Sequence, residues 1–238
     1  MYSLTMSSNP VNPVRRPDLK RDMVYAWLKR RLTTGRLCFG ERLSIREISA
    51  QTGASRFPVQ AAVNDLQVEG FLHVIPQSGL RVVRPTVVEI QDFFLLFSRV
   101  EGILAELSAL RRPEVLLGRM QAVQEKIRAL DSTESVSGER YRRLNQALHG
   151  LLHTAANSPH LERAAKANWA MSDFLINQSN LFRSHLEESI DQHDKLLAAI
   201  GAQDALAARR EMEAHIMSFG ADVISNILKG RMPANLAL

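Results

Sequence analysis

Cysteine is almost absent from this chain of 238 residues, which has a single thiol at Cys38. One thiol excludes an internal disulfide and a zinc or iron–sulfur site made of cysteines. Long hydrophobic runs are also missing, because apolar stretches such as residues 93–97 are far shorter than the roughly 20 residues of a membrane-spanning helix. Aromatic residues are only 6% of the chain, yet its 45% hydrophobic and 23% charged fractions are those of a globular protein. The composition predicts one or two folded domains and no membrane segment.

The N-terminal residues 1–17 are polar, contain three prolines and have no apolar centre. They therefore lack the pattern of a secretory signal. We expect a flexible arm at residues 1–17, followed by the folded domains of a cytoplasmic protein.

Positive charge is concentrated in the first third of the chain. Residues 1–86 contain 13 Lys and Arg against 6 Asp and Glu, whereas residues 87–238 contain 17 against 19. A basic segment joined to a slightly acidic one favours a nucleic-acid-binding module fused to a second domain. A solvated basic surface is the alternative that charge alone leaves open.

Residues 18–85 have the pattern of a winged helix-turn-helix. Helical spacing of apolar residues predicts a first helix over residues 19–34. Ser44 and Glu47 have the spacing of a capping box, which predicts the start of a second helix that ends at Gly53. Ser55 is a good N-cap for a third helix.

A β-hairpin follows the three predicted helices. The β-rich runs 71–75 and 80–83 flank a turn at residues 76–79 and predict the wing. In this fold the third helix enters the major groove of DNA with its N-terminal residues leading. Arg56 can then bond guanine or a phosphate, and Gln60 can bond adenine. The candidate DNA-binding residues are Arg46, Ser55, Arg56, Phe57, Gln60, Gln77, Ser78, Gly79 and Arg81.

The rest of the chain, residues 86–232, shows helical periodicity and no strand pattern. Short connections between the helices favour an antiparallel bundle. The fold class is therefore mainly α, with an N-terminal winged helix-turn-helix and a C-terminal all-helical bundle. The predicted helices cover residues 87–111, 114–130, 137–156, 159–182, 186–200 and 203–229.

Three histidines occupy core-facing positions on three different predicted helices. They are His149, His193 and His215, each inside or beside an apolar stripe. A single such histidine is more often structural than a ligand. Three histidines together with a fourth ligand that donates through oxygen suit Zn²⁺ or Ni²⁺. His153 lies four residues after His149, but no Glu completes an H-E-x-x-H motif, so we interpret His153 as a structural residue or as one that supports a metal ligand.

The first domain resembles the GntR family of bacterial transcription regulators over about residues 20–85. The resemblance rests on GERLSIREI at 40–48, GASRFPVQAA at 53–62 and LQVEGF at 66–71. The usual family phrase is G-V-S-R-T-P-V-R-E-A-L, from which Phe57, Gln60 and Ala61 depart. The resemblance implies binding to double-stranded operator DNA, and Gln60 stands where the family often has a DNA-reading arginine.

The second domain resembles the FCD ligand-binding domain of the FadR branch over about residues 87–229. The matching stretches are NQALHGLLHTAANSPH at 145–160, QHDKLLAAIGAQD at 192–204 and AARREMEAH at 207–215. The resemblance implies a metal held by Asn145, His149, His193 and His215, with Asn145 in place of the family's Asp, and a small organic acid beside it.

The effector's binding residues are less well marked by this resemblance. The position where the family tends to carry an arginine is Phe97, and the nearby candidates are Arg99 and Glu101. This departure leaves two alternatives. Either the carboxylate of the effector is held by other residues than in the family, or the effector is less acidic.

The expected function is that of a ligand-responsive repressor, released from its operator by a small carboxylate and acting as a homodimer. Residues 93–107 are apolar on more than one helical face, which favours a dimer contact or a fully enclosed central helix. A metal-dependent hydrolase would need a general base that the matched positions lack. A metal-independent, architectural DNA-binding protein is the other alternative.

Overall fold

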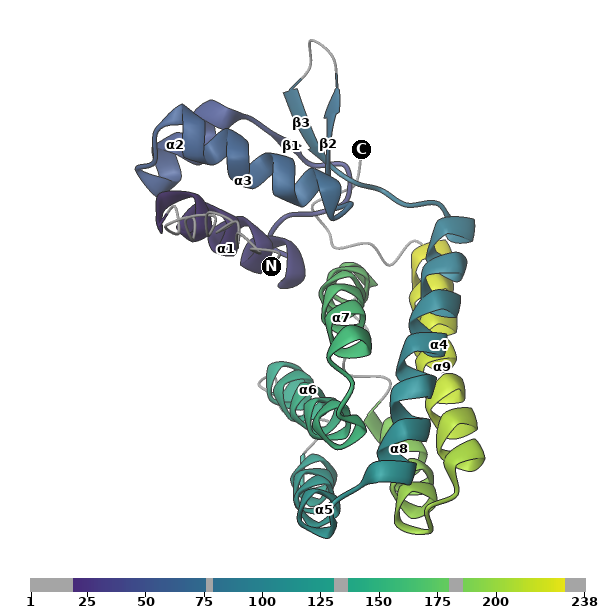
Figure 1. The fold of residues 1–238 in the computed structure, drawn as a ribbon. Helices are drawn as coiled ribbons and strands as arrows, with labels where there is room; N and C mark the ends of the chain where they lie inside the picture. Colours follow the sequence, from purple (N-terminus) through teal and green to yellow (C-terminus); the bar gives the residue numbers. More distant parts are fainter. Residues whose placement is uncertain (1–18, 76–78, 131–136, 180–185, 230–238) are drawn as a thin grey trace, which may run out of the picture.

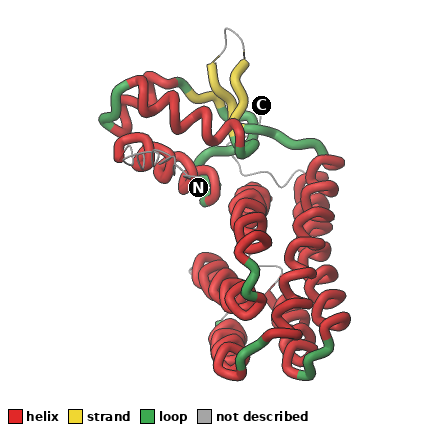
Figure 2. The backbone as a smooth tube through the Cα atoms, viewed as in Figure 1, coloured by secondary structure: helices red, strands yellow, loops and turns green. Residues whose placement is uncertain are grey.

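A computed structural model describes residues 19–75, 79–130, 137–179 and 186–229. Within these residues it contains nine α-helices and one small sheet. Figure 1 shows two parts, the head, which comprises residues 19–83, and the bundle, which comprises residues 87–228. The strands are confined to the head, and the described part of the bundle is entirely helical (Figure 2). The predicted fold class is confirmed.

The head contains three helices and three short strands. In chain order they are α1 (Leu19–Thr33), β1 (Arg42–Leu43), α2 (Ile45–Thr52), α3 (Arg56–Val68), β2 (Leu72–Ile75) and β3 (Gly79–Val82). The sheet is antiparallel in the order β1-β3-β2, so β3 pairs with β1 through Arg42 and Arg81. The two-residue β1 was not predicted, because it is too short to produce a periodic pattern.

The predicted capping residues explain where α2 begins and ends. Ser44 and Glu47 form both hydrogen bonds of the capping box, and Gly53 ends the helix with a φ of 67°. Such a positive φ is accessible to glycine at little cost. Ser55 is the N-cap of α3, but its side chain makes no capping hydrogen bond.

The bundle contains six helices, all close to their predicted ranges. They are α4 (Val87–Arg111), α5 (Glu114–Arg128), α6 (Ser137–Ala156), α7 (Pro159–Ser179), α8 (Leu186–Gly201) and α9 (Ala205–Leu228). A capping box of Thr86 and Glu89 begins α4. None of the helices among the described residues is both long and apolar enough to cross a membrane.

The head is packed against the C-terminal half of α7. The ring of Phe174 meets the rings of Phe39 and Phe71 edge-on, with centroid distances of 5.1 and 5.5 Å. Gln178 Nε2 donates to the carbonyl oxygen of Leu37, and Gln178 Oε1 accepts from the backbone N–H of Phe39, both at 3.0 Å. These hydrogen bonds are buried, so the head and the bundle share a specific interface.

Helices α4 and α9 lie side by side along the outside of the bundle (Figure 1). A glycine on each helix permits their close approach. A Cβ atom at Gly102 would lie 2.6 Å from Glu213 Cγ, and one at Gly220 would lie 2.7 Å from Phe94 Cγ. Phe94 is buried, so its ring has little room to move away from such a Cβ.

We expect Gly220→Ala to lower the free energy of unfolding. Overpacking against Phe94 costs roughly 1–3 kcal/mol, which exceeds the ~1 kcal/mol that alanine gains over glycine in a helix. Gly150→Ala is the matched control, because nothing lies within 4 Å of a Cβ at this helical glycine. Urea unfolding of both variants measures the effect. A Gly220→Ala protein as stable as the control would contradict the close packing.

Candidate functional site

The predicted DNA-reading surface lies at the N-terminal end of α3. Arg56 is exposed, and Phe57 is 79% exposed, so its ring does not pack inside the head. Gln60 is half-buried, and its Nε2 donates to Asn64 Oδ1 at 3.0 Å. Arg46 is exposed in the first turn of α2. These side chains are available to DNA, and Asn64 sets the direction of the Gln60 amide.

Gly79 and Arg81 are the predicted wing residues that lie in the described part of the wing. Gly79 begins β3 with a φ of 88°, and a Cβ there would lie 3.3 Å from the carbonyl oxygen of Leu43. Arg81 is half-buried, and its Nη1 donates to the carbonyl oxygen of Gly40 at 3.4 Å. Ser55 is exposed beside α3. The other two predicted wing residues, Gln77 and Ser78, lie outside the described residues.

The three histidines meet inside the bundle. His149 on α6, His193 on α8 and His215 on α9 are buried, and one ligand nitrogen of each lies within 4.8 Å of the others. The His193 and His215 ring centroids are 4.7 Å apart, and that of His149 lies 5.5 Å from the His215 centroid. The sequence placed these residues on three helices, and the fold brings their rings together.

Each of the three imidazole rings is held through its Nδ1 atom. Glu101 Oε2 lies 2.9 Å from His149 Nδ1, Gln124 Oε1 lies 3.2 Å from His193 Nδ1, and Gln192 Oε1 lies 2.7 Å from His215 Nδ1. Carboxylate and amide oxygens accept hydrogen bonds, so each Nδ1 carries the proton. In a neutral ring the lone pair is then on Nε2, the tautomer that a metal ion requires.

The two glutamine amides are themselves oriented by acceptors. Gln124 Nε2 donates to the carbonyl oxygen of Ile190 at 3.0 Å and to Asp194 Oδ1 at 2.9 Å. Gln192 Nε2 donates to Glu188 Oε1 at 2.8 Å. In both cases the amide nitrogen is engaged, which leaves the amide oxygen to accept from a histidine. Sequence reasoning missed both glutamines, because an amide on a helix has no distinctive pattern.

Glu101 on α4 is hydrogen-bonded to one histidine of the cluster, His149, and to the neighbouring His153. It accepts from Trp169 Nε1 at 3.0 Å, and its carboxylate oxygens lie 2.9 Å from His149 Nδ1 and His153 Nε2. Burial alone raises the pKa of the Glu101 carboxyl, but the hydrogen bonds from the two histidines outweigh burial and lower the pKa to about 2. Both oxygens of the predicted effector-binding residue Glu101 therefore accept hydrogen bonds, and one of them holds His149 Nδ1.

Asn145 completes the set of predicted metal ligands. It is 8% exposed and lies one helical turn before His149 on α6. Asn145 Oδ1 and His149 Nε2 are both buried, and neither has a hydrogen-bond partner among the described residues. A buried oxygen and a buried imidazole nitrogen without partners are costly unless a ligand satisfies them. The donor set therefore fits a borderline metal ion such as Zn²⁺ or Ni²⁺.

The predicted effector-binding residue Arg99 lies away from this cluster. Its side chain is 53% exposed and forms an ion pair with Glu213 on α9. Arg99 and Glu213 line a shallow groove on the outside of the bundle, together with Leu95 and Met217. Arg99 is two residues before Glu101, and this spacing turns the two side chains to different sides of α4.

Arg142 is the arginine that sequence reasoning missed. It lines a narrow cavity of about 20 Å³, together with Asn145 and His215. Its Nη1 donates to Asp173 Oδ2 on α7 at 3.3 Å. Arg142 is three residues before Asn145 and seven before His149, the spacing that places all three on one face of α6. That spacing was the available signal.

This combination of a winged helix-turn-helix head and a helical domain with a buried histidine cluster defines a DNA-binding transcription regulator. The family model described as bacterial regulatory proteins, gntR family, matches residues 20–82. The FCD domain model matches residues 92–218. The chain therefore belongs to the GntR family of bacterial regulatory proteins and carries an FCD domain. This is a family of transcription regulators, not of enzymes.

Relatives and solved structures agree with this assignment. The chain is 25% identical to the HTH-type transcriptional repressor GlaR of Escherichia coli over 82% of this chain and 91% of that protein. It is 22% identical to the uncharacterized HTH-type transcriptional regulator YdhC of Bacillus subtilis, over 80% and 85% of the two chains. Among solved structures, E. coli McbR/YncC has a TM-score of 0.70 at 21% identity, and the match covers 88% of this chain and 98% of that one. The structure of a putative GntR regulator from Rhodococcus has a TM-score of 0.69 at 16% identity, and the match covers 87% of this chain and 98% of that one.

The buried Asp173 carboxyl predicts how stability depends on pH. Burial raises its pKa from 3.8 to about 6, and the contacts with Arg142 and Gln146 offset only part of this rise. Because the folded pKa lies above the unfolded value, ionisation of Asp173 costs stability as pH rises from about 4 to about 6. We expect Asp173→Asn to remove this cost. The unfolding free energy of Asp173→Asn minus that of the parent protein should increase by roughly 2–3 kcal/mol over this pH range. Above about pH 6 the difference should become constant.

Chemical denaturation between pH 4 and pH 8 measures this difference. Asp191→Asn is the control for the loss of one negative charge, because Asp191 is exposed on α8. A constant difference between Asp173→Asn and the parent protein at every pH would contradict a raised pKa at Asp173.

Proposed function

We propose that this transcription regulator is a ligand-responsive repressor, released from its operator by a small organic acid bound beside a metal ion in the FCD domain. The observation that carries the proposal is the arrangement of the three histidines. Each ring is buried, and each Nδ1 is held by an acceptor that leaves Nε2 as the ligand atom. Asn145 Oδ1 and His149 Nε2 in addition lie buried without a hydrogen-bond partner among the described residues, which packing alone would not explain.

The proposed metal ligands are Asn145, His149, His193 and His215. Three imidazoles and one amide oxygen are a suitable set for Zn²⁺ or Ni²⁺. A bound ion would supply a Lewis-acidic attachment point for an oxygen of the effector. Glu101 would set the orientation of His149, and Gln124 and Gln192 would do the same for His193 and His215.

The proposed DNA-contacting residues are Arg46, Ser55, Arg56, Phe57, Gln60, Gln77, Ser78, Gly79 and Arg81. Arg56 and Gln60 are proposed to read base edges in the major groove, because they lie in the first two turns of the recognition helix. Arg46 would contact the phosphate backbone. Repression is the favoured direction of control because GlaR, a relative over most of the chain, is named as a repressor.

A second copy of this chain is the proposed partner of the outer face of α4. Leu95 and Leu96 are 47% and 58% exposed there, and Met217 on the adjacent α9 is 40% exposed. A contiguous apolar face of this kind favours a protein contact. A homodimer with two-fold symmetry would place two heads on two operator half-sites.

The metal proposal predicts about one Zn²⁺ or Ni²⁺ ion per chain in purified protein, and its loss in His193→Ala. Elemental mass spectrometry of protein supplied with both metals measures the content. His160→Ala is the matched control, because His160 is exposed on α7 and lies outside the cluster. Absence of metal from the parent protein would favour a metal-independent DNA-binding protein with a non-sensing bundle.

The DNA proposal predicts that Arg56→Ala weakens binding to the operator by about 1–3 kcal/mol and has a smaller effect on random DNA. The operator is first selected from a random pool with the parent protein. Binding is then measured at one fixed salt concentration, since phosphate contacts depend strongly on salt. Arg119→Ala, at an exposed arginine on α5, is the control. Equal losses on operator and random DNA would mean that Arg56 contacts only phosphate.

A further inference from the structure

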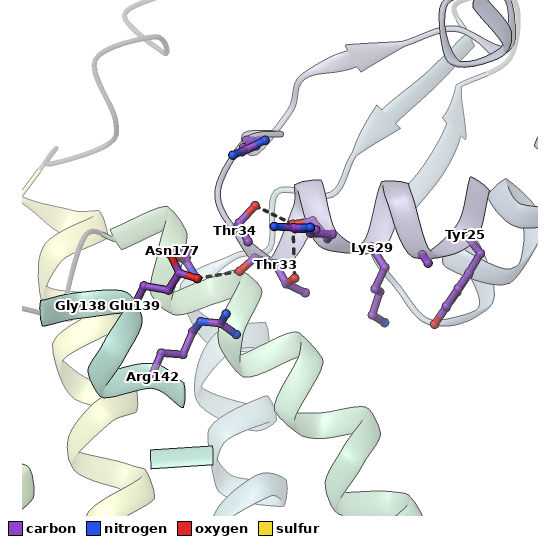
Figure 3. A pocket seen from close by; sticks show the side chains of 11 residues that line it. Tyr25, Lys29, Thr33, Thr34, Gly138, Glu139, Arg142 and Asn177 are labelled. Carbon is purple, nitrogen blue, oxygen red and sulfur yellow. Dashed lines mark hydrogen bonds between the residues drawn. The ribbon is translucent and has the colours of Figure 1, made fainter. Parts of the chain in front are cut away.

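Arg142 occupies the wall between two spaces in the molecule. One is the narrow cavity of about 20 Å³ beside Asn145 and His215. The other is an open cleft of about 790 Å³ between α1 of the head and the helices α6 and α7. Figure 3 shows the Arg142 side chain projecting from α6 into this cleft. Among the described residues that line the narrow cavity, Arg142 is the only Lys or Arg.

Arg142 is only weakly engaged in this arrangement. Its single hydrogen bond to a described residue joins Nη1 to Asp173 Oδ2 at 3.3 Å. Gln146 Nε2 donates to the same oxygen at 2.7 Å. A guanidinium has five donor hydrogens and pairs best with a carboxylate through two parallel bonds. An incoming carboxylate can therefore offer Arg142 a better partner than Asp173 does.

The narrow cavity must widen before it can hold an organic acid. A volume of about 20 Å³ accommodates about one water molecule. Arg142 and Gln146 on α6 both bond Asp173 on α7, so these contacts hold the two helices together beside the cavity. A ligand that takes Arg142 from Asp173 would remove part of this link and let α7 move relative to α6.

Helix α7 connects the histidine cluster to the head. Near the middle of α7, Trp169 Nε1 donates to Glu101, and its ring lies edge-on to His149 at a centroid distance of 4.7 Å. One turn later comes Asp173. Beyond it, Asn177 Nδ2 donates to the carbonyl oxygen of Thr33 at 2.7 Å (Figure 3), and Gln178 holds the backbone that follows α1. A displacement of α7 therefore reaches the head directly.

We propose that Arg142 is the receptor for the carboxylate of a small organic acid, and that its exchange of Asp173 for this carboxylate shifts α7 and loosens the head. The inference rests on the proposed function, because it names the effector-binding residue and the route of regulation within the same domain. The acid would lie between Arg142 and the side of the cavity formed by Asn145 and His215. Asp173 then acts as an internal carboxylate that competes with the ligand for one guanidinium.

Two substitutions separate this role from a structural one, because they change ligand affinity in opposite directions. Arg142→Gln should weaken acid binding by roughly 10- to 100-fold, with Arg142→Lys intermediate. Asp173→Asn should tighten binding, because it removes the competing carboxylate. Arg119→Gln is the control and should leave binding unchanged, because Arg119 is exposed on α5 and does not line the cavity. A purely structural ion pair would give the same direction of change for both Arg142→Gln and Asp173→Asn.

The probes are acetate, succinate and citrate, with succinamide as an uncharged analogue of succinate. All variants are made in the full chain with Trp27→Phe, so that Trp169 is the only tryptophan left. Trp169 lines the cavity, and its fluorescence reports binding. Hydrogen exchange of the Phe39 amide reports the head, because this amide is protected by Gln178 Oε1. We expect an acid that changes Trp169 emission to speed this exchange, and succinamide to do neither.

Each other outcome overturns a defined part of the proposal. Equal acid affinities in Arg142→Gln and the parent protein would remove Arg142 as the receptor and leave the ligand-responsive repressor intact. A fluorescence response with no change in Phe39 exchange would overturn the route through α7. No response of the parent protein to any of the three acids would overturn the carboxylate receptor, whereas metal content and operator binding judge the regulator independently.

Discussion

The buried carboxylate of Glu101 is the group on which the rest of the bundle depends. Glu101 on α4 brings a negative charge into the core of the bundle, where such a charge is stable only if it is fully hydrogen-bonded. His149 and His153 from α6 and Trp169 from α7 supply those bonds. One side chain thereby links three helices, fixes the ring of a proposed metal ligand and holds the middle of α7, the helix that contacts the head. Removing it would leave three buried ring N–H groups to find other partners.

The remaining histidines follow the same logic with neutral acceptors. Asp194 orients Gln124, and Glu188 orients Gln192. A glutamine amide therefore stands between each of these negative charges and its histidine. This arrangement keeps the ring tautomers defined without placing three carboxylates around one small site. It would also allow Asn145, as a proposed metal ligand, to take the place of the aspartate that the family resemblance implies. Glu101 already supplies a negative charge next to His149, so a neutral oxygen at position 145 leaves the net charge of a metal site moderate.

Local rules explain why so much of the fold was predictable. The helix ranges followed from apolar spacing, and the Ser44–Glu47 capping box and the turn at Gly53 formed as their residue types predict. The strand β1 escaped detection because two residues carry no period. Within the site, the histidines were found because buried histidines are uncommon, whereas Arg142 and the two glutamines resemble surface residues in the sequence. Arg99 and Glu101 are close along the chain, but residues two positions apart differ by about 200° around a helix, and Arg99 lies on the outside of the bundle.

The way in which the head is attached constrains how a signal can reach DNA. Gln178 bonds the backbone of Leu37 and Phe39, and Phe174 fills the space between two rings of the head. A displaced α7 must either carry this part of the head with it or leave buried backbone groups without partners, at a cost of roughly 1–3 kcal/mol for each group. Packed interfaces of this kind exchange between discrete arrangements and do not deform continuously. The proposed coupling between the cavity beside Arg142 and the head is therefore expected to act as a switch between two head positions, and its size is limited by how differently a ligand would bind in each of them.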